Sequence, residues 1–394
     1  MPSPHRRIVV LLLAAHATLS CRQEPAETWG FVATLGDDTT SVERITRRGD
    51  RIEGDAVGRS PAVVRRRWEM TLALDGTVRR WTMDTHIPNA PAGEGDLHHE
   101  IERSGGTIRM VRRTGSDSMD RTVREPSQRT VPWNAFLYAS TELLVQGARG
   151  LPDSAHIGQY FFEGWEEGRL GYANLRQLGD RRVSIASTGL SGSGVARLDD
   201  QGRMLSYSGE GTTYRQEVHR VSEVPDLDSL LERFAAAERT TGMPRALSVR
   251  DTARGTIGRA TIDVDYSRPL QRGRTLLGGL IPYDRVWRTG ANAATQLSTT
   301  APIQLAGVAL DSGAYTLWTL PTESGVQLVI NRETGQWGTG YKAANDIARV
   351  AMEVDTLEVP VERFTIGIDT AASRLTMEWG TLRWSASVEP MSGR

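Results

Sequence analysis

The sequence is poor in the residues on which several common chemistries depend. It has one cysteine, Cys21, and one lysine, Lys342, in 394 residues. A single cysteine excludes a disulfide within the chain. A P-loop is excluded as well, because no Gly-Lys-Ser/Thr sequence occurs. All seven histidines lie at or before His219, so the C-terminal part cannot build a Cys/His zinc site or a complete Ser-His-Asp triad by itself.

The chain also lacks an excess of charge of either sign and a long apolar run. Its net charge is −1, which argues against binding to nucleic acid through a general electrostatic field. The run from Ile8 to Ala15 is far shorter than the roughly 20 apolar residues of a membrane-spanning helix. Arginine makes up all but one of the 47 basic residues. We draw no function from that preference.

The first 21 residues have the pattern of an export signal. Arg6 and Arg7 form a positive start, the apolar run follows, and small residues lead to Cys21. This order resembles the signal and lipid-modified cysteine of bacterial lipoproteins, although Thr18 stands where such signals usually have leucine. The resemblance implies lipidation of Cys21, attachment to a membrane and a location in the bacterial cell envelope. Ordinary secretion, with cleavage near this point, is the alternative.

Residues 22–224 have the pattern of an antiparallel β domain. Trp68, Met70 and Leu72 alternate with polar residues and are followed by the turn sequence Asp75-Gly76. Further turn signals lie at Ser104-Gly105-Gly106 and from Asp199 to Gly202. One helix, capped by Asn134 and ending at Gly147, interrupts the strands. We predict a curved antiparallel sheet with this helix against one face.

A second helix is predicted from Asp226 to Thr241. Leu227, Leu230, Leu231 and Phe234 recur at helical spacing, and Gly242 and Pro244 follow as stop signals. Because the composition changes here, we interpret residues 225–245 as a helical connector between two domains.

Residues 246–394 return to short strands and predict a β-sandwich. Turn signals separate the expected strands, which are Ala260–Tyr266, Gln296–Thr299, Ala314–Leu320, Val326–Asn331, Ala348–Val354, Phe364–Asp369, Leu375–Trp379 and Arg383–Val388. The whole chain is therefore predicted to be all-β with few helices.

Several sequence blocks in this C-terminal part carry a family resemblance. The first runs from Asp265 to Thr295, and later blocks are Gly313 to Trp318, Val329 to Asn331, Gln336-Trp337-Gly338 and Phe364 to Ile366. Together they resemble the DUF2911 family over about residues 246–390. The resemblance implies the identity of a domain and no particular reaction, because the function of that family is unknown.

Two aspartates in the first of the expected C-terminal strands are candidate catalytic residues. In a strand Asp263 and Asp265 share one face, about 6.5–7 Å apart at a rise of about 3.3 Å per residue. Carboxylates so placed can act as acid and base in glycoside hydrolysis or bind calcium. They can equally form ion pairs with Arg268, Arg274 or Arg288, and this structural role is the interpretation that we prefer.

The same block predicts a ligand-binding rim. An indole next to a guanidinium, followed by a glycine turn and an amide, can hold a sugar or a carboxylate. The candidate ligand-binding residues are Arg268, Arg274, Tyr283, Trp287, Arg288 and Asn292. The structural alternative is that Trp287 belongs to the core and that Arg288 pairs with Asp265.

His98-His99-Glu100 is the one sequence that suggests a metal site, and we reject it. Neighbouring residues of a strand point to opposite faces, so His98 and His99 cannot share an ion. We expect neither a metal nor a cofactor. No complete catalytic set is present, so the sequence favours a binding or structural module for a small polar ligand, a glycan or a peptide. The alternatives are an envelope glycan hydrolase that uses Asp263 and Asp265, and a pure scaffold.

Overall fold

The structure is a computed structural model that describes residues 25–391. Within that range the description omits residues 60–61, 92–93, 116, 126–128, 135, 149–153, 162–169, 189–191, 213 and 242–247. The export signal and Cys21 therefore lie outside the described residues. No helix in the described part is long and apolar enough to cross a membrane.

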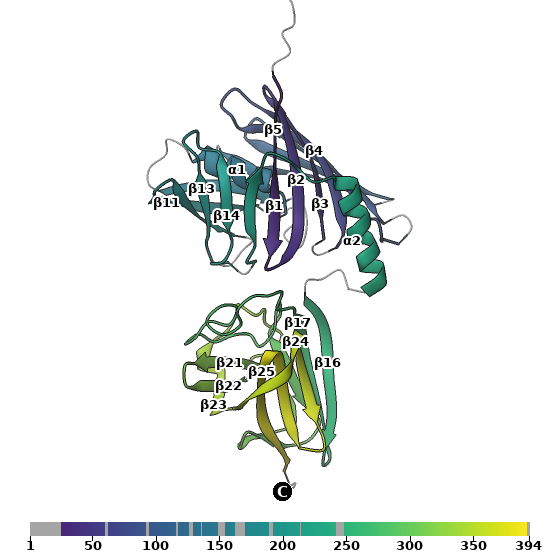
Figure 1. The fold of residues 1–394 in the computed structure, drawn as a ribbon, viewed down its shortest axis with the longest axis vertical. Coiled ribbons are helices and arrows are strands. Elements are labelled where there is room, and N and C mark those ends of the chain that lie inside the picture. The colour runs from purple at the N-terminus through teal and green to yellow at the C-terminus, as the bar shows by residue number, and fades with distance from the viewer. Residues whose placement is uncertain are drawn as a thin grey trace, which may run out of the picture.

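Strands dominate the fold and confirm the all-β prediction. They make up 63% of the structure, and two α-helices accompany them in the described ranges. Figure 1 shows two β-rich parts arranged along the long axis of the molecule. Each part has its own sheet or sheets and its own hydrophobic core.

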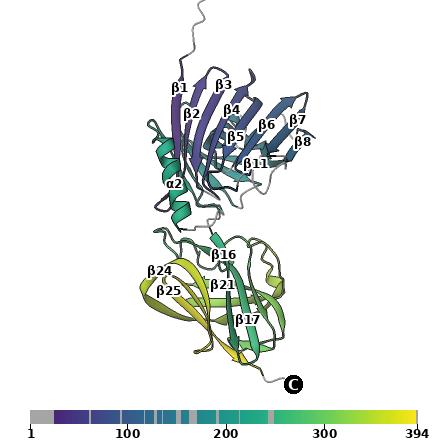
Figure 2. The same ribbon diagram turned by 90° about the vertical axis from the view of Figure 1, so that its right-hand side faces the viewer.

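The N-terminal part is one sheet of 15 strands. The strands are β1 (Glu27–Leu35), β2 (Asp38–Arg48), β3 (Arg51–Gly58), β4 (Val64–Leu72), β5 (Val78–His86), β6 (Asp96–Ser104), β7 (Thr107–Thr114), β8 (Asp117–Arg124), β9 (Thr130–Trp133), β10 (Ser154–Phe161), β11 (Leu170–Gly179), β12 (Arg182–Ser187), β13 (Gly194–Leu198), β14 (Met204–Ser208) and β15 (Glu217–Val221). Their order in the sheet is β8-β7-β6-β5-β4-β3-β2-β1-β15-β14-β13-β12-β11-β10-β9. Figure 2 shows the first eight strands side by side.

The predicted hairpins are present. Asp75-Gly76 lies between β4 and β5, Gly105-Gly106 lies between β6 and β7, and Asp199 to Gly202 connects β13 with β14. Gly76, with a φ of 79°, adopts the left-handed conformation that the turn requires. Local turn chemistry thus determines these strand pairs.

Two details of this sheet differ from the prediction. The pair β9–β10 is parallel, because helix α1 (Tyr138–Gly147) lies between the two strands as a crossover. Asn134 does not cap α1, whose N-cap residue is Leu137. The side chain of Asn134 instead accepts a hydrogen bond from the backbone N–H of Phe136 in the turn before the helix.

The two faces of the sheet have different coverings. The inner face carries the main hydrophobic core, to which α1 contributes Leu137 and Leu144. Helix α2 (Leu227–Thr241) begins after Asp226, whose carboxylate accepts a hydrogen bond from the N–H of Ser229. The helix packs on the outer face, where its Leu227 joins a small core on β2 and β3. Helix α2 therefore covers the N-terminal sheet as well as preceding the next domain.

The C-terminal part is a sandwich of a six-stranded and a four-stranded sheet, as predicted. The strand orders are β16-β17-β18-β21-β22-β23 and β20-β19-β25-β24. The elements are β16 (Ser248–Ile257), β17 (Ala260–Pro269), β18 (Thr295–Thr299), β19 (Ile303–Leu305), β20 (Val308–Leu310), β21 (Gly313–Thr322), β22 (Gly325–Asn331), the 3-10 turn η1 (Ala343–Asn345), β23 (Asp346–Ala351), β24 (Glu353–Asp369) and β25 (Arg374–Pro390). Side chains from both sheets, such as Ile262 and Phe364, share one core.

The C-terminal strands differ in number and length from the predicted ones. Strands β16, β19 and β20 were not predicted. Strand β25 was predicted as two strands divided at Gly380, a residue with a φ of 58° that lies inside one long strand. Turn residues alone could not distinguish this irregularity within a strand from a true loop.

Among the described residues, three hydrogen bonds join the two parts. Arg272 Nε donates to Asp38 Oδ2 over 2.7 Å, and the Asp37 N–H donates to the Arg272 carbonyl over 3.3 Å. Arg215 Nη1 donates to the Gly279 carbonyl over 2.7 Å. Loops of the N-terminal sheet therefore contact the sequence block that the analysis singled out.

Candidate functional site

The two candidate aspartates lie on the outward face of β17 and are paired with arginines of β16. Asp263 accepts two hydrogen bonds from Arg254, at 2.5 and 2.9 Å, and Asp265 pairs with Arg250 at 2.7 Å. The expected partners Arg268, Arg274 and Arg288 were wrong, because β16 had not been identified as a strand. The Arg254 guanidinium lowers the pKa of Asp263, whereas the general acid of a glycosidase needs a raised pKa.

Arg268 has a structural set of contacts. Its guanidinium donates to Asp251 over 2.8 Å, to the Phe364 carbonyl over 3.1 Å and to the Thr365 hydroxyl over 2.7 Å. These bonds connect β17 with its neighbour β16 in the six-stranded sheet and with β24 in the four-stranded sheet. Arg268 thus links both sheets of the sandwich.

Trp287 lies in an aromatic cluster between the sheets. Its ring stacks on Trp379 with centroids 5.8 Å apart and meets Phe364 and Trp384 edge-on at 5.3 and 6.4 Å. Its backbone pairs with Thr319. This geometry corresponds to the core alternative that the sequence analysis left open for this residue.

Arg274 and Arg215 hold their charges without an ion pair in the described ranges. Arg274 donates to the carbonyls of Gln271 and Leu270, at 3.0 and 2.8 Å. Burial, together with the nearby charges of Arg272 and Arg215, lowers the pKa of Arg274 to about 10. Burial also lowers the pKa of Arg215. Positive charge is therefore concentrated where the two domains meet.

Arg288 is the least satisfied of these arginines. Its Nε is buried and has no hydrogen-bond partner, and no ion pair to Arg288 is found among the described residues. Burial lowers the pKa of Arg288, and the charge of Arg215 adds to that effect. A buried charge is costly unless it is paired. Arg288 therefore carries a buried charge that no described residue neutralises.

An exposed tryptophan lies near Arg288. Trp337, which precedes the Gly338 that contacts the arginine stem, is 57% exposed. Tyr283 is 38% exposed, and its ring lies beside Gly278. Asn292 is exposed as well, and its carbonyl accepts a hydrogen bond from the Gly338 N–H over 2.9 Å. A Cβ atom on Gly338 would lie 2.2 Å from Arg288 Cδ, so only glycine lets the arginine stem pass here.

The backbone of this loop is strained. Thr289 and Asn292 have φ values of 53° and 58°, in the left-handed region that β-branched residues avoid. Thr289 is fully buried and is held by its neighbours, because its carbonyl accepts a 2.6 Å hydrogen bond from the Thr295 hydroxyl. Strain of this kind concentrates at functional sites.

The structure separates the residues of the predicted rim. Arg268 and Trp287 hold the sandwich together, whereas Arg288 and Asn292 lie in the strained loop. Arg274, like Arg288, is near the charge of Arg215, and Tyr283 lies beside Gly278. Two members were missed. Trp337 is in a block quoted only for the resemblance, and Arg215 comes from the other domain, so no local signal connected it with this loop.

Comparison with known proteins finds a family model that matches this part of the chain. The DUF2911 family model matches residues 248–388. That family is described as a protein of unknown function. The match covers the C-terminal domain and confirms the resemblance seen in the sequence, and no family model matches the N-terminal region. No curated protein matches the sequence.

Among solved structures, two matches are themselves proteins of uncharacterised families. A DUF1089 family protein from Pseudomonas aeruginosa is 16% identical, with a TM-score of 0.35, and the match covers 44% of this chain and 92% of that one. A beta-barrel-like protein of domain of unknown function DUF1849 from Brucella abortus is 9% identical, with a TM-score of 0.32, and the match covers 51% and 97%. Likenesses this weak carry no argument about function.

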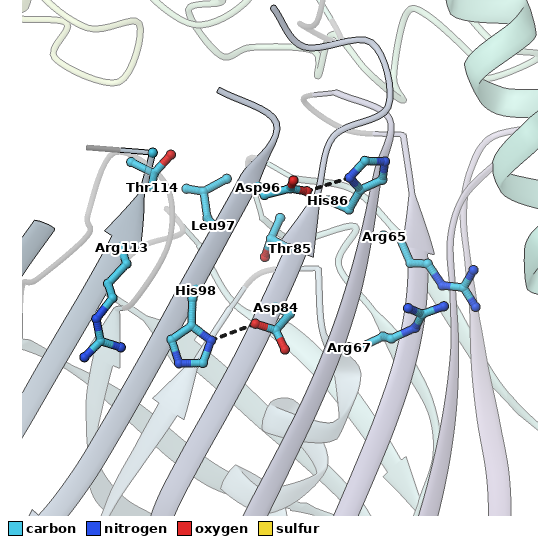
Figure 3. A pocket seen from close by; sticks show the side chains of 11 residues that line it. Arg65, Arg67, Asp84, Thr85, His86, Asp96, Leu97, His98, Arg113 and Thr114 are labelled. Carbon is cyan, nitrogen blue, oxygen red and sulfur yellow. Dashed lines mark hydrogen bonds and ion pairs between the residues drawn. The ribbon is translucent and has the colours of Figure 1, made fainter. Parts of the chain in front are cut away.

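A second candidate site lies outside the DUF2911 domain, on the outer face of the N-terminal sheet. A hollow of about 450 Å³ and another of about 400 Å³ share Arg67 and Asp84. In the first hollow, His98 Nδ1 lies 2.7 Å from Asp84 Oδ1, and His86 Nδ1 lies 2.7 Å from Asp96 Oδ1 (Figure 3).

The two histidines of His98-His99-Glu100 lie on opposite faces of the sheet. His98 is on the outer face, whereas His99 is 2% exposed and points to the opposite side. No group of three or more metal-ligating side chains occurs in the described part of the chain.

Proposed function

We propose that this protein is an exported, lipid-anchored binding module whose DUF2911 domain holds an acidic group of a small polar ligand, glycan or peptide. The export signal and Cys21 support the envelope location. The loop that contains Arg288 and Asn292 supports the binding role. The proposal involves no catalysed reaction.

The unpaired guanidinium of Arg288 carries this proposal. Carboxylates and phosphates match the planar fork of arginine, and a pairing in a buried place is strong because little water screens it. Arg274 and Arg215 add positive charge in the same region. A ligand anion would supply the counter-charge that the described residues do not provide.

The exposed rim suggests how a polar ligand would be selected. The Trp337 indole offers a flat apolar face next to the charged group, as sugars and peptide side chains require. Asn292 adds an amide that can both donate and accept hydrogen bonds. Arg215 comes from the loop before β15 of the N-terminal part, so the complete site needs both domains.

Thermal unfolding of the full chain with and without small acids tests the proposal. We expect glucuronate and inorganic phosphate to raise the unfolding temperature and neutral glucose to leave it unchanged, because ligands stabilise the state that binds them. Arg288→Ala should abolish the shift. Trp337→Ala should weaken the effect of glucuronate more than that of phosphate, which has no apolar face.

Arg254→Ala is the matched control, since Arg254 is an exposed arginine of the same domain that is already paired with Asp263. Its ligand-induced shift should equal that of the wild type. Without ligand, Arg288→Ala should be at least as stable as the wild type, because it removes an unpaired buried charge. A large loss of stability in Arg288→Ala, together with no response to either acid, would support the scaffold alternative instead.

A further inference from the structure

A row of directly opposed charged residues crosses six strands on the outer face of the N-terminal sheet. Adjacent strands pair the residues in the order Arg44, Asp55, Arg67, Asp84, His98 and Arg113, one each from β2 to β7. Opposed residues on one face have side chains close enough to interact. Base and acid alternate through the first four positions, so every charge there has an opposite neighbour.

The alternation fails at the β7 end of the row. His98 has Asp84 on one side and Arg113 on the other, so two basic side chains are adjacent (Figure 3). The next residue across the sheet is Ser118, which is neutral. In the described part of the chain Arg113 makes no ion pair. Asp120 is within electrostatic range of it but is held by two hydrogen bonds from Arg109.

A second histidine in the same hollow provides an internal comparison. His86 is also fixed by a carboxylate, and the arginine opposite it in the register is Arg65. That arginine is already bound to Asp55 and to Asp228 of helix α2. Arg65, opposite His86, is thus ion-paired, whereas Arg113, opposite His98, makes no ion pair among the described residues.

We infer that His98 and Arg113 bind the carboxylate of an acidic oligosaccharide that lies across β4 to β7. Arg113 provides the guanidinium fork. Asp84 holds His98 by its Nδ1, which leaves Nε2 facing the hollow as a second contact. Three strand spacings of about 4.8 Å give the ligand a path of about 14 Å along the row.

The remaining chemistry of the hollow favours a sugar chain over other acids. Side chains that alternately donate and accept suit hydroxyl groups, which do both. Asp84 lies next to His98, so a doubly charged phosphate is repelled more than a singly charged carboxylate. Strands β4 to β7 are internal, with their backbone groups already paired. An extended peptide could therefore not add to them as a further strand.

Calorimetric titration of the full chain with trigalacturonate, at low ionic strength, tests this inference. The titration is made in the Arg288→Ala variant, so that binding at the DUF2911 loop does not contribute. We expect binding that Arg113→Gln weakens by about tenfold or more and His98→Asn by several-fold, because each removes one of the two contacts. The matched control His86→Asn should bind as tightly as the Arg288→Ala parent, and a neutral trisaccharide should not bind.

Each other outcome has a definite meaning. No heat of binding, or equal binding by the parent and Arg113→Gln, would overturn the inference. Equal weakening by His86→Asn and His98→Asn would also overturn it, since it would show a general charge effect in the hollow. Inorganic phosphate that binds more tightly than trigalacturonate would assign the site to a different anion. None of these results bears on Arg288, so the two proposals fail separately.

Discussion

The buried carboxylate of Glu43 should make the stability of the N-terminal domain fall as the pH rises. Glu43 is on β2 and fully buried. It accepts hydrogen bonds from the Tyr138 and Ala139 N–H groups at the start of α1, at 2.7 and 3.1 Å, and from Trp68 Nε1 at 3.0 Å. Burial outweighs these bonds and raises the pKa of Glu43 to about 7, from an ordinary 4.5.

The sign and size of the effect follow from this shift. The folded state holds the proton of Glu43 more tightly than the unfolded state does. The associated stability is therefore fully present below pH 4.5 and is lost as the pH rises through 7. A rise from 4.5 to about 7, at about 1.36 kcal/mol per pKa unit, corresponds to roughly 3 kcal/mol.

Urea unfolding from pH 4.5 to 8 of the wild type and Glu43→Gln measures this contribution. Glutamine cannot ionise, so the difference in free energy of unfolding between the two proteins should change by roughly 3 kcal/mol across this range, in favour of the variant at high pH. Taking the difference cancels the groups that do not interact with Glu43. Glu142 is not one of them, because its charge also raises the pKa of Glu43. Because the two domains can unfold in separate transitions, the free energy is taken from the unfolding transition that Glu43→Gln shifts.

The absolute stability of the variant is a separate matter. The glutamine amide would place an N–H donor near the Trp68 N–H, which costs about 1–3 kcal/mol at every pH. A difference between the two proteins that stays constant from pH 4.5 to 8 would refute the reasoning. It would mean that Glu43 ionises in the folded state as readily as in the unfolded chain.

Two further predictions concern the anchor and the sandwich. Cys21→Ser should move the protein from the membrane fraction to the soluble fraction on cell fractionation, because an acyl chain contributes about 0.8 kcal/mol per buried CH₂ to membrane binding. An unchanged distribution would contradict the lipid anchor. Arg268→Ala should lower the free energy of unfolding of the DUF2911 domain by about 2 kcal/mol, since it breaks charged hydrogen bonds between two sheets. Arg254→Ala, which removes an exposed ion pair, should lower the free energy of unfolding in urea much less than Arg268→Ala does. Equal losses from the two alanine variants would contradict the role given to Arg268.

The sequence by itself determined the features that depend on a few neighbouring residues. Asp75-Gly76 predicted the β4–β5 turn, because a tight hairpin needs left-handed backbone that glycine adopts without strain. The helical spacing of Leu227, Leu230 and Leu231 predicted α2, because apolar residues three and four apart share one face of a helix. Alternation also placed His98 and His99 on opposite faces, which excluded a shared metal ion before any fold was known.

Tertiary structure alone decided which distant side chains meet. Asp263 pairs with Arg254, and Trp287 rather than Trp337 enters the core, because of a strand and a sheet packing that no local pattern revealed. The charged row that ends at Arg113 exists only in the register of six strands. A shift of one residue in any strand would move its member to the other face. Such contacts depend on the pairing of strands far apart in sequence, and that pairing is set by the packing of the whole sheet.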